Sequence, residues 1–138
     1  MPTYRTIAST LAIAVAFALP TLAQAKTPAL LAAIAHKTNS TQRLHDCAVS
    51  AAPVSRCNGA VNNSMAFSNQ VLHAIESAVL AARSSDCNGA VKRFARYYTS
   101  ARNAYLILFR APTSSNLIGY EVAQGTVDDT LRFVLDYC

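Results

Sequence analysis

Apolar residues recur every three or four positions through most of this 138-residue chain. That spacing places side chains on one face of an α-helix, and alternation typical of strands is nearly absent. Two of the stripes are long: Cys57, Val61, Ser64, Ser68, Leu72, Ile75 and Val79, then Cys87, Val91, Phe94, Tyr98, Ala101, Tyr105 and Leu108. The sequence therefore predicts an all-α bundle built around two long antiparallel helices, the first running from Pro53 to Ala82.

Shorter helices are predicted on either side of this pair. Residues 27–37 and 41–50 are two helical segments separated by "TNS", and "RAPTSSN" (110–116) is a loop in which Pro112 disfavours helix at the preceding residue. Residues 117–125 are ambiguous, with a short helix ending at Gly125 as one option. Thr126 and Asp129 resemble a capping box that starts a final helix. Ser84 or Ser85 is the expected N-cap of the second long helix.

The N-terminus has the layout of a secretory signal peptide. Arg5 precedes an apolar stretch over residues 7–19, and Ala23-Gln24-Ala25 supplies small residues for cleavage. A membrane anchor is the alternative, but the stretch is shorter than the span of about 20 residues that a bilayer requires. We expect a cleaved signal peptide at 1–25 and one periplasmic α-helical domain at 26–138, with no membrane span after cleavage.

Export changes how the charge is interpreted. The chain carries 12 basic and 7 acidic side chains, and all but Arg5 lie in the expected mature domain. In a cytosolic protein this excess would suggest nucleic acid as a partner. Outside the cytoplasm it favours an acidic protein surface, anionic lipid or cell-wall polymer instead.

An even number of cysteines in a small exported domain predicts disulfides. Zinc is the competing use, but closely spaced cysteine pairs are absent, and no C-x-x-C indicates a thiol oxidoreductase. A continuous helix from residue 53 to 82 would hold Cys57 and Cys87 about 40 Å apart, which excludes that pair. The final helix brings Cys138 back toward Cys87, so we predict Cys47–Cys57 and Cys87–Cys138 at opposite ends of the bundle.

The word "CNGAV" begins at Cys57 and again at Cys87, and Gly59, Gly89 and Gly119 keep the same period of thirty residues. Either an old duplication or two similar helix starts reached independently would produce this pattern. Few other positions agree between the copies, so the sequence leaves the choice open.

No arrangement typical of catalysis or of a cofactor site is found in the sequence. His36, His45 and His73 are scattered, and the pair His73 and Glu76 lacks the second such pair that a metal in a helical bundle needs. Paired carboxylates, a nucleophile elbow and a phosphate loop are missing. We therefore expect neither enzymatic activity nor a bound metal or cofactor.

Two exposed helix faces are candidates for partner binding. Opposite the core stripe of the second long helix lie Lys92, Arg93, Arg96, Asn103 and Arg110. This basic face has two interpretations: it is an ordinary solvated helix face, or it is a docking surface for an acidic partner. The corresponding face of residues 59–77 is polar, small and uncharged: Gly59, Asn62, Asn63, Ala66, Asn69, Gln70, His73 and Ser77. Whether a partner covers that face is left open.

Three segments carry a resemblance to a known family: "LHDCAVSAAPVSRCNGAV" (44–61), the helix start at Cys87, and the ending "TLRFVLDYC" (130–138). Together they resemble the Rap/Tai group of type VI secretion immunity proteins, which are small, exported and α-helical. The positions that match the group's pattern are Cys47, Cys57, Gly59, Ala60, Val61, Cys87, Leu131 and Cys138. The chain departs from it at Ala60, where an aromatic residue is commoner, and in the longer connection over 106–125.

The resemblance implies an inhibitor that covers the active-site cleft of a cell-wall amidase delivered into the periplasm. The alternatives are a periplasmic carrier of a metal or small ligand, and an envelope protein that binds anionic polymer. A homodimer also remains open. For a partner we expect contacts from the basic face and the following loop: Lys92, Arg93, Arg96, Arg110, Pro112 and Ser114.

Overall fold

The computed structural model describes residues 27–50, 53–78 and 84–138, and the signal peptide predicted at 1–25 lies outside these ranges. The described residues form four α-helices and one 3₁₀ turn. They are α2 (Pro28–Val49), η1 (Val54–Cys57), α3 (Asn58–Ser77), α4 (Ser85–Arg110) and α5 (Ser114–Tyr137). The predicted all-α bundle is confirmed.

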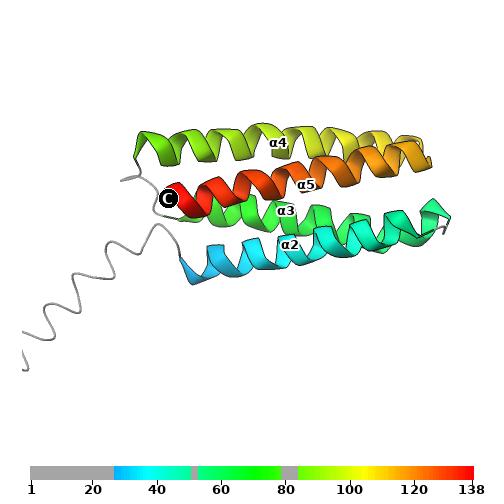
Figure 1. Cartoon of the computed structure of the whole chain (residues 1–138), viewed down its shortest axis with the longest axis horizontal. Helices are drawn as coiled ribbons and strands as arrows, with labels where there is room; N and C mark the ends of the chain where they lie inside the picture. The colour runs from blue at the N-terminus through cyan, green and yellow to red at the C-terminus, as the bar shows by residue number, and fades with distance from the viewer. Residues whose placement is uncertain (1–26, 51–52, 79–83) are drawn as a thin grey trace, which may run out of the picture.

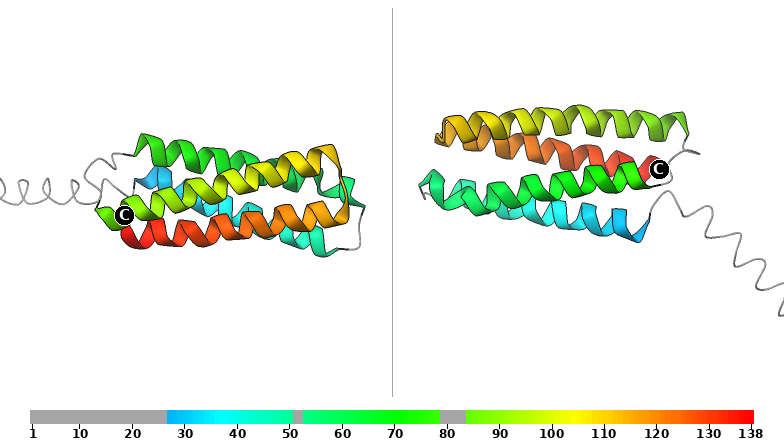
Figure 2. Two further views of the ribbon diagram at one scale, coloured as in Figure 1. Left: turned by 90° about the horizontal axis from the view of Figure 1, so that it is seen from above. Right: turned by 180° about the vertical axis from the view of Figure 1, so that it is seen from behind.

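Each helix runs in the opposite direction to the one before it, so the bundle is an up-and-down arrangement (Figure 1). The closest packing lies within two hairpins, α4 against α5 and α2 against α3. Between the hairpins, α2 packs against α5 more closely than α3 does against α4. The bundle seen from above and from behind has the same elongated shape (Figure 2).

The expected break at "TNS" does not occur, because α2 is one helix of 22 residues. Thr27 caps its start by accepting a hydrogen bond from the backbone N–H of Leu30 at 3.1 Å. The hydroxyls that favour loops in isolation here donate back to the helix, Thr38 to the carbonyl of Ile34 at 2.9 Å and Ser40 to that of Lys37 at 2.6 Å. With its polar groups satisfied, the segment continues as helix.

The two central helices differ in extent from the prediction. The chain after Pro53 begins as the 3₁₀ turn η1, becomes α-helical at Asn58 and ends at Ser77, short of the expected Ala82. In α4 the hydroxyl of Ser84 accepts from the N–H of Cys87, as an N-cap does. At 26 residues α4 is the longest of the described helices.

The C-terminal segment is a single helix of 24 residues, so the predicted stop at Gly125 and the capping box after it are both wrong. Helix α5 begins at Ser114 and places Thr126 in its interior, where the hydroxyl donates to the carbonyl of Val122. Glycine lowers helix propensity only moderately. The burial of Tyr120, Gln124 and Val127 on one face outweighs that cost. The terminal helices, with 22 and 24 residues, are therefore comparable in length to the central ones, with 20 and 26.

Two apolar clusters fill the interior between the helices. One surrounds Phe94, Leu30 and Leu131, and the other surrounds Tyr120, Leu44 and Leu108, with all four helices contributing. Within the described residues no helix has both the length and the apolar character needed to cross a membrane. The buried stripes of the helices thus meet each other at the centre of the bundle.

Two disulfides join neighbouring helices, and they are the pairs that the sequence predicts. Cys47 at the end of α2 is bonded to Cys57 at the start of α3, with Cα atoms 5.8 Å apart. Cys87 at the start of α4 is bonded to Cys138 after α5, with Cα atoms 4.8 Å apart. Each copy of "CNGAV" therefore begins a helix that a disulfide ties to its partner in the same hairpin.

Removal of the disulfides one at a time should destabilise the protein unequally. They close loops of 10 and 51 residues, for which chain entropy gives about 3 and about 4 kcal/mol respectively. We expect Cys87→Ala with Cys138→Ala to lower the free energy of unfolding more than Cys47→Ala with Cys57→Ala, measured by urea denaturation. The variants are well matched, since each loses one fully buried sulfur, at Cys57 or Cys87. A larger loss for the Cys47–Cys57 pair would contradict this account.

Candidate partner-binding surface

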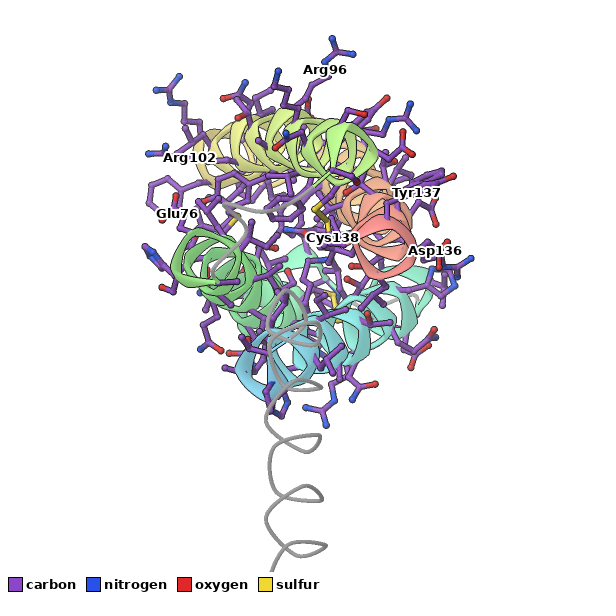
Figure 3. The ribbon with its side chains drawn as sticks, turned by 90° about the vertical axis from the view of Figure 1, so that its left-hand side faces the viewer. Glu76, Arg96, Arg102, Asp136, Tyr137 and Cys138 are labelled. Atoms are coloured by element: carbon purple, nitrogen blue, oxygen red, sulfur yellow. A yellow bond between two sulfur atoms is a disulfide. The ribbon has the colours of Figure 1, made fainter. Side chains whose placement is uncertain are left out.

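Helix α4 carries most of the excess positive charge of the bundle. It has five basic residues and one acidic residue, whereas α5 has one basic and four acidic residues. Lys92, Arg96 and Arg102 are exposed, and Arg96 and Arg102 project away from the other helices (Figure 3). No ion pair within the described residues involves a cation of α4. Their charge is therefore available to an acidic surface.

Arg93 differs from its neighbours because it packs on a ring of the same chain. Its guanidinium carbon lies 5.0 Å from the centre of the Phe133 ring, and Phe133 stacks in turn on Tyr137. Arg93 would lose this cation–π contact if its guanidinium moved to bind a partner. Lys92 and Arg96 are the freer members of the predicted set.

The other three predicted residues lie at the far end of the helix. Arg110 is the last residue of α4, 18 positions after Lys92, which corresponds to about 27 Å along the helix axis. Pro112 lies in the turn, and Ser114 is the first residue of α5 rather than part of a loop. The structure thus divides the predicted contact residues between two places, one midway along α4 and one at the α4–α5 turn.

The turn between α4 and α5 is short and well fixed, although the sequence suggested a longer loop. Only Ala111, Pro112 and Thr113 lie between the helices. Thr113 caps α5 by accepting from the N–H of Asn116 at 3.2 Å, and the Asn116 side chain donates to the carbonyl of Ala111 at 2.8 Å. These hydrogen bonds fix the backbone of the turn that contains Pro112 and follows Arg110.

Beside this turn the surface is apolar, which the sequence analysis missed. Phe109 is 77% exposed, the largest exposure of any large hydrophobic side chain in the described part of the chain. It borders a hollow of about 310 Å³ between α3 and α4, lined by Val54, Asn58, Val61, Asn62, Tyr105, Leu108, Phe109 and Pro112. We call Phe109, Pro112 and this hollow the turn-end surface. A single exposed aromatic gives no periodic signal, so only its position on the folded helix reveals it.

In the described part of the single chain, no other segment covers the uncharged face of α3. Asn62, Asn69 and their neighbours on this face face solvent. Tyr105 donates to the side-chain oxygen of Asn62 at 3.1 Å, and Tyr98 donates to that of Asn69. These two bonds bridge α4 and α3 where packing between the helices is sparse. The side chains of Asn62 and Asn69 therefore link α3 to α4 at the surface of the bundle.

A wider groove of about 540 Å³ runs between α2 and α5. Next to it Lys37 is fully buried, and its Nζ donates to Asp128 at 2.6 Å, to Thr41 at 2.7 Å and to the carbonyl of Gln124 at 3.3 Å. Burial lowers the pKa of Lys37, while the carboxylate of Asp128 acts in the opposite direction. The buried ammonium is thus matched to one specific acceptor on α5.

The same groove carries a second pair at its rim. The imidazole Nδ1 of His45 on α2 contacts the carboxylate of Glu121 on α5. This hydrogen bond raises the pKa of His45, since the charged imidazolium is the better donor to a carboxylate. Both pairs join α2 to α5, whereas Asp129 and Arg132 also line the groove and are exposed.

A chain of hydrogen bonds crosses the centre of the bundle from α5 to α3. The Tyr120 hydroxyl lies 2.7 Å from that of Ser64, the Gln124 amide donates to Tyr120 at 2.8 Å, and Ser68 donates to Gln124 at 3.0 Å. Burial raises the pKa of Tyr120 to about 12. In the described residues every buried side-chain nitrogen or oxygen has a partner. The network supports the fold and offers no free reactive group.

The remaining histidines do not form a metal site in the described part of the chain. His73 is exposed and lies 3.5 Å from Glu76, and His36 stacks on Phe67. In those same ranges no three histidine, cysteine, aspartate or glutamate side chains are grouped as metal ligands would be.

Sequence reasoning missed Lys37, although one signal was present. Lys37 lies on the buried stripe of α2 between Ile34 and Leu44. A lysine at such a position usually extends its amine to solvent. Only the folded structure shows that Asp128 meets it from α5, 91 residues later in the chain.

Comparison of the chain with protein-family models, with curated proteins and with solved structures finds no match in any of the three.

The buried pair gives a prediction that depends on pH. Asp128→Asn leaves a fully buried Lys37 without its counter-charge, and we expect a loss of about 3 kcal/mol in the free energy of unfolding at neutral pH. Lys37→Met should cost less, because Asp128 is 16% exposed at the groove and retains contact with water. The measurement is urea denaturation of both variants and of the unchanged protein.

The sign of the pH dependence follows from the lowered pKa of Lys37. Without the carboxylate this pKa falls further, so folded Asp128→Asn releases the proton at a lower pH than the unchanged protein does. The unfolded chain keeps that proton up to its ordinary value of 10.5. The deficit of the variant should therefore shrink as the pH rises toward that value. Equal losses in the two variants, or a deficit independent of pH, would contradict the assignment.

Proposed function

We propose that this protein is a periplasmic inhibitor of a toxic cell-wall amidase delivered by type VI secretion, and that it acts by binding over the active-site cleft of the enzyme. The segments resembling the Rap/Tai immunity group support this role, and the all-α fold agrees with what that resemblance implies. The signal peptide at 1–25 belongs to the same proposal. The two disulfides suit an oxidising compartment outside the cytoplasm.

The exposure of Phe109 is the observation that carries the binding role. An aromatic side chain that is 77% exposed beside an open hollow is an anchor of the kind that dominates protein interfaces. Arg110 precedes the turn and Pro112 lies within it. Arginine is enriched at interface hot spots, and proline restricts the backbone of the turn. Because the turn is held by capping bonds, little ordering would be needed when a partner binds.

The position of the anchor also suits an inhibitor that enters a cleft. The α4–α5 turn lies at one end of the elongated bundle (Figure 1). A narrow end presents a smaller cross-section to a concave site than the side of a bundle does. The turn-end surface would then fill the cleft while the rest of the bundle covers its rim.

The basic face of α4 has a separate role in this proposal. Lys92 and Arg96 have no ion pairs within the described residues and lie on the helix that leads to the turn. Charges at the rim of an interface mainly accelerate association with an oppositely charged partner. They would steer an acidic enzyme toward the bundle, whereas Phe109 would hold it there.

A second function is favoured by the same cations. An envelope protein that binds an anionic cell-wall polymer would use the exposed Lys92, Arg96 and Arg102. Such binding would weaken steeply with salt and would not depend on Phe109. The effect of substitutions at Phe109 therefore distinguishes the two functions.

The test uses the secreted product of the gene next to that of this chain, assayed for hydrolysis of purified peptidoglycan. The unchanged protein should abolish hydrolysis at stoichiometric concentration. Phe109→Ala should weaken inhibition about 30-fold or more, as expected of an anchor worth about 2 kcal/mol. Leu31→Ala is the matched control, because Leu31 is also exposed, at 44%, but lies in the first turn of α2, which begins at the other end of the bundle. We expect it to inhibit like the unchanged protein.

Charge reversal at Lys92 and Arg96 should slow association with the enzyme and leave the dissociation rate nearly unchanged. Arg93 is kept, because its contact with Phe133 is structural. Full inhibition by Phe109→Ala would contradict the turn-end surface as the docking site. A neighbouring product without peptidoglycan hydrolase activity would contradict the amidase itself.

A further inference from the structure

A recess between α2 and α3 has features that neither the fold nor the proposed inhibitor role explains. It has a volume of about 360 Å³ and lies on a different pair of helices from the turn-end surface. Helix α2 contributes its residues at spacings of three and four, and α3 contributes the start of its uncharged face. The residues lining the recess are His36, Asn39, Ser40, Arg43, Gly59, Ala60, Asn63 and Phe67.

Two of the residues that line the recess form a stacked pair of rings. The imidazole of His36 stacks on the ring of Phe67, with centroids 5.6 Å apart and planes inclined by 18°. Phe67 is half-buried, so one part of its ring packs on the bundle and another lines the recess. A stacked pair of this kind offers a planar apolar surface to a ligand with a flat group.

The other walls carry hydrogen-bond donors that have no partner among the residues that the structure describes. Within the described residues Arg43 forms no ion pair, and the carboxamides of Asn39 and Asn63 form no hydrogen bond. All three side chains reach the same hollow from two helices. The recess therefore combines one guanidinium and two amides whose donors are available.

The charge of the recess selects the ligand. None of its lining residues is acidic, so Arg43 gives the lining of the recess a net positive charge. The groove between α2 and α5 is larger, but two of its carboxylates are already paired with Lys37 and His45. The groove also has Arg132 in its lining, but Asp128, Asp129 and Glu121 line the same groove, whereas no carboxylate lines the recess. An arginine fork with planar donors beside it matches a carboxylate.

Gly59 is one of the residues lining the recess, and the fold does not require a glycine there. Its backbone does not adopt the positive φ that favours glycine, and a Cβ built on it meets nothing within 4 Å. Alanine would be the better helix former. The missing side chain leaves the space above α3 open, which is what a ligand needs.

The second "CNGAV" lines a hollow with some of the same residue types. Gly89 lines a hollow of about 300 Å³ beside another stacked pair, Phe133 and Tyr137, whose rings are inclined by 3°. There Arg93 covers Phe133, and Asp86 supplies a carboxylate within the same hollow. The Gly59 recess has the glycine, the ring pair and the arginine, but no carboxylate of its own.

We propose that the Gly59 recess binds a carboxylate attached to a flat apolar group. The guanidinium of Arg43 and the amides of Asn39 and Asn63 donate to the carboxylate oxygens, and the flat group packs on the ring pair. Two sources share this chemistry, a small aromatic acid and the C-terminal residue of a polypeptide. The site is independent of the turn-end surface and of the inhibitor role.

The experiment is a titration of the folded, disulfide-bonded protein, labelled with ¹⁵N, at low ionic strength. Benzoate and N-acetylphenylalanine are the probes, and benzamide and N-acetylphenylalaninamide are their uncharged counterparts. We expect saturable shifts of the Gly59 backbone amide and of the Asn39 and Asn63 side-chain amides, with a dissociation constant in the millimolar range for so small and exposed a site. The amide probes should produce none. Tighter binding of N-acetylphenylalanine than of benzoate would identify a polypeptide terminus as the source, and the reverse a free acid.

Two variants and their controls complete the test. Arg43→Gln removes the cation, and Gly59→Leu fills the recess; each should weaken binding about tenfold or more. The controls are Arg102→Gln, an exposed cation on α4, and Gly119→Leu, an open helical glycine that lines none of the hollows described above. Both should bind like the unchanged protein. Absence of saturable shifts with either acid overturns the proposal, and so does equal weakening by Arg43→Gln and Arg102→Gln, which would indicate diffuse attraction of anions.

Discussion

The disulfides at opposite ends of the bundle constrain where every other contact can form. Cys47–Cys57 fixes the end of α2 beside the start of α3, and Cys87–Cys138 fixes the start of α4 beside the end of α5. Each hairpin is thereby locked in register, so that side chains far apart in sequence meet at defined positions. The meeting of Lys37 with Asp128 between the two hairpins requires both registers at once. A domain of this size has a small core, and such cross-links offset that limitation.

Much of the fold follows from the sequence. A helix that buries one face needs apolar residues every three or four positions, and this spacing can be recognised in the sequence. The stripes through Cys57 and Cys87 predicted the central helices. Helix length then excluded one pairing of the cysteines, and the direction of the final helix favoured the pairing that the structure shows. The breaks at Thr38 and Gly125 were wrong for a physical reason. Local propensity favours a loop at each, but the hydroxyl of Thr38 bonds back to its helix and the burial of Tyr120 and Gln124 holds α5 together. Such compensation depends on the neighbouring helices, which a local pattern does not contain.

The surface was less predictable than the core. The exposed cations of α4 were found because charge can be counted along one helix face. Phe109 and the recess above Gly59 were not found, since each depends on two elements that meet only in the folded chain. The structure thus separates three surfaces that the sequence had merged or missed: a basic face that attracts, an apolar end that anchors, and a recess with free donors. In the proposed inhibitor the first two act together on one partner, and the recess is available to another ligand.

Hydrogen–deuterium exchange of the protein with and without the neighbouring amidase tests the central claim most directly. If the turn-end surface enters the active-site cleft, the enzyme should slow exchange in the last turn of α4, in residues 111–113 and in the first turn of α5. The amides of α2 and of the last turns of α3 should exchange as in the free protein. Protection confined to the α2–α3 side, with the α4–α5 turn unchanged, would contradict the account.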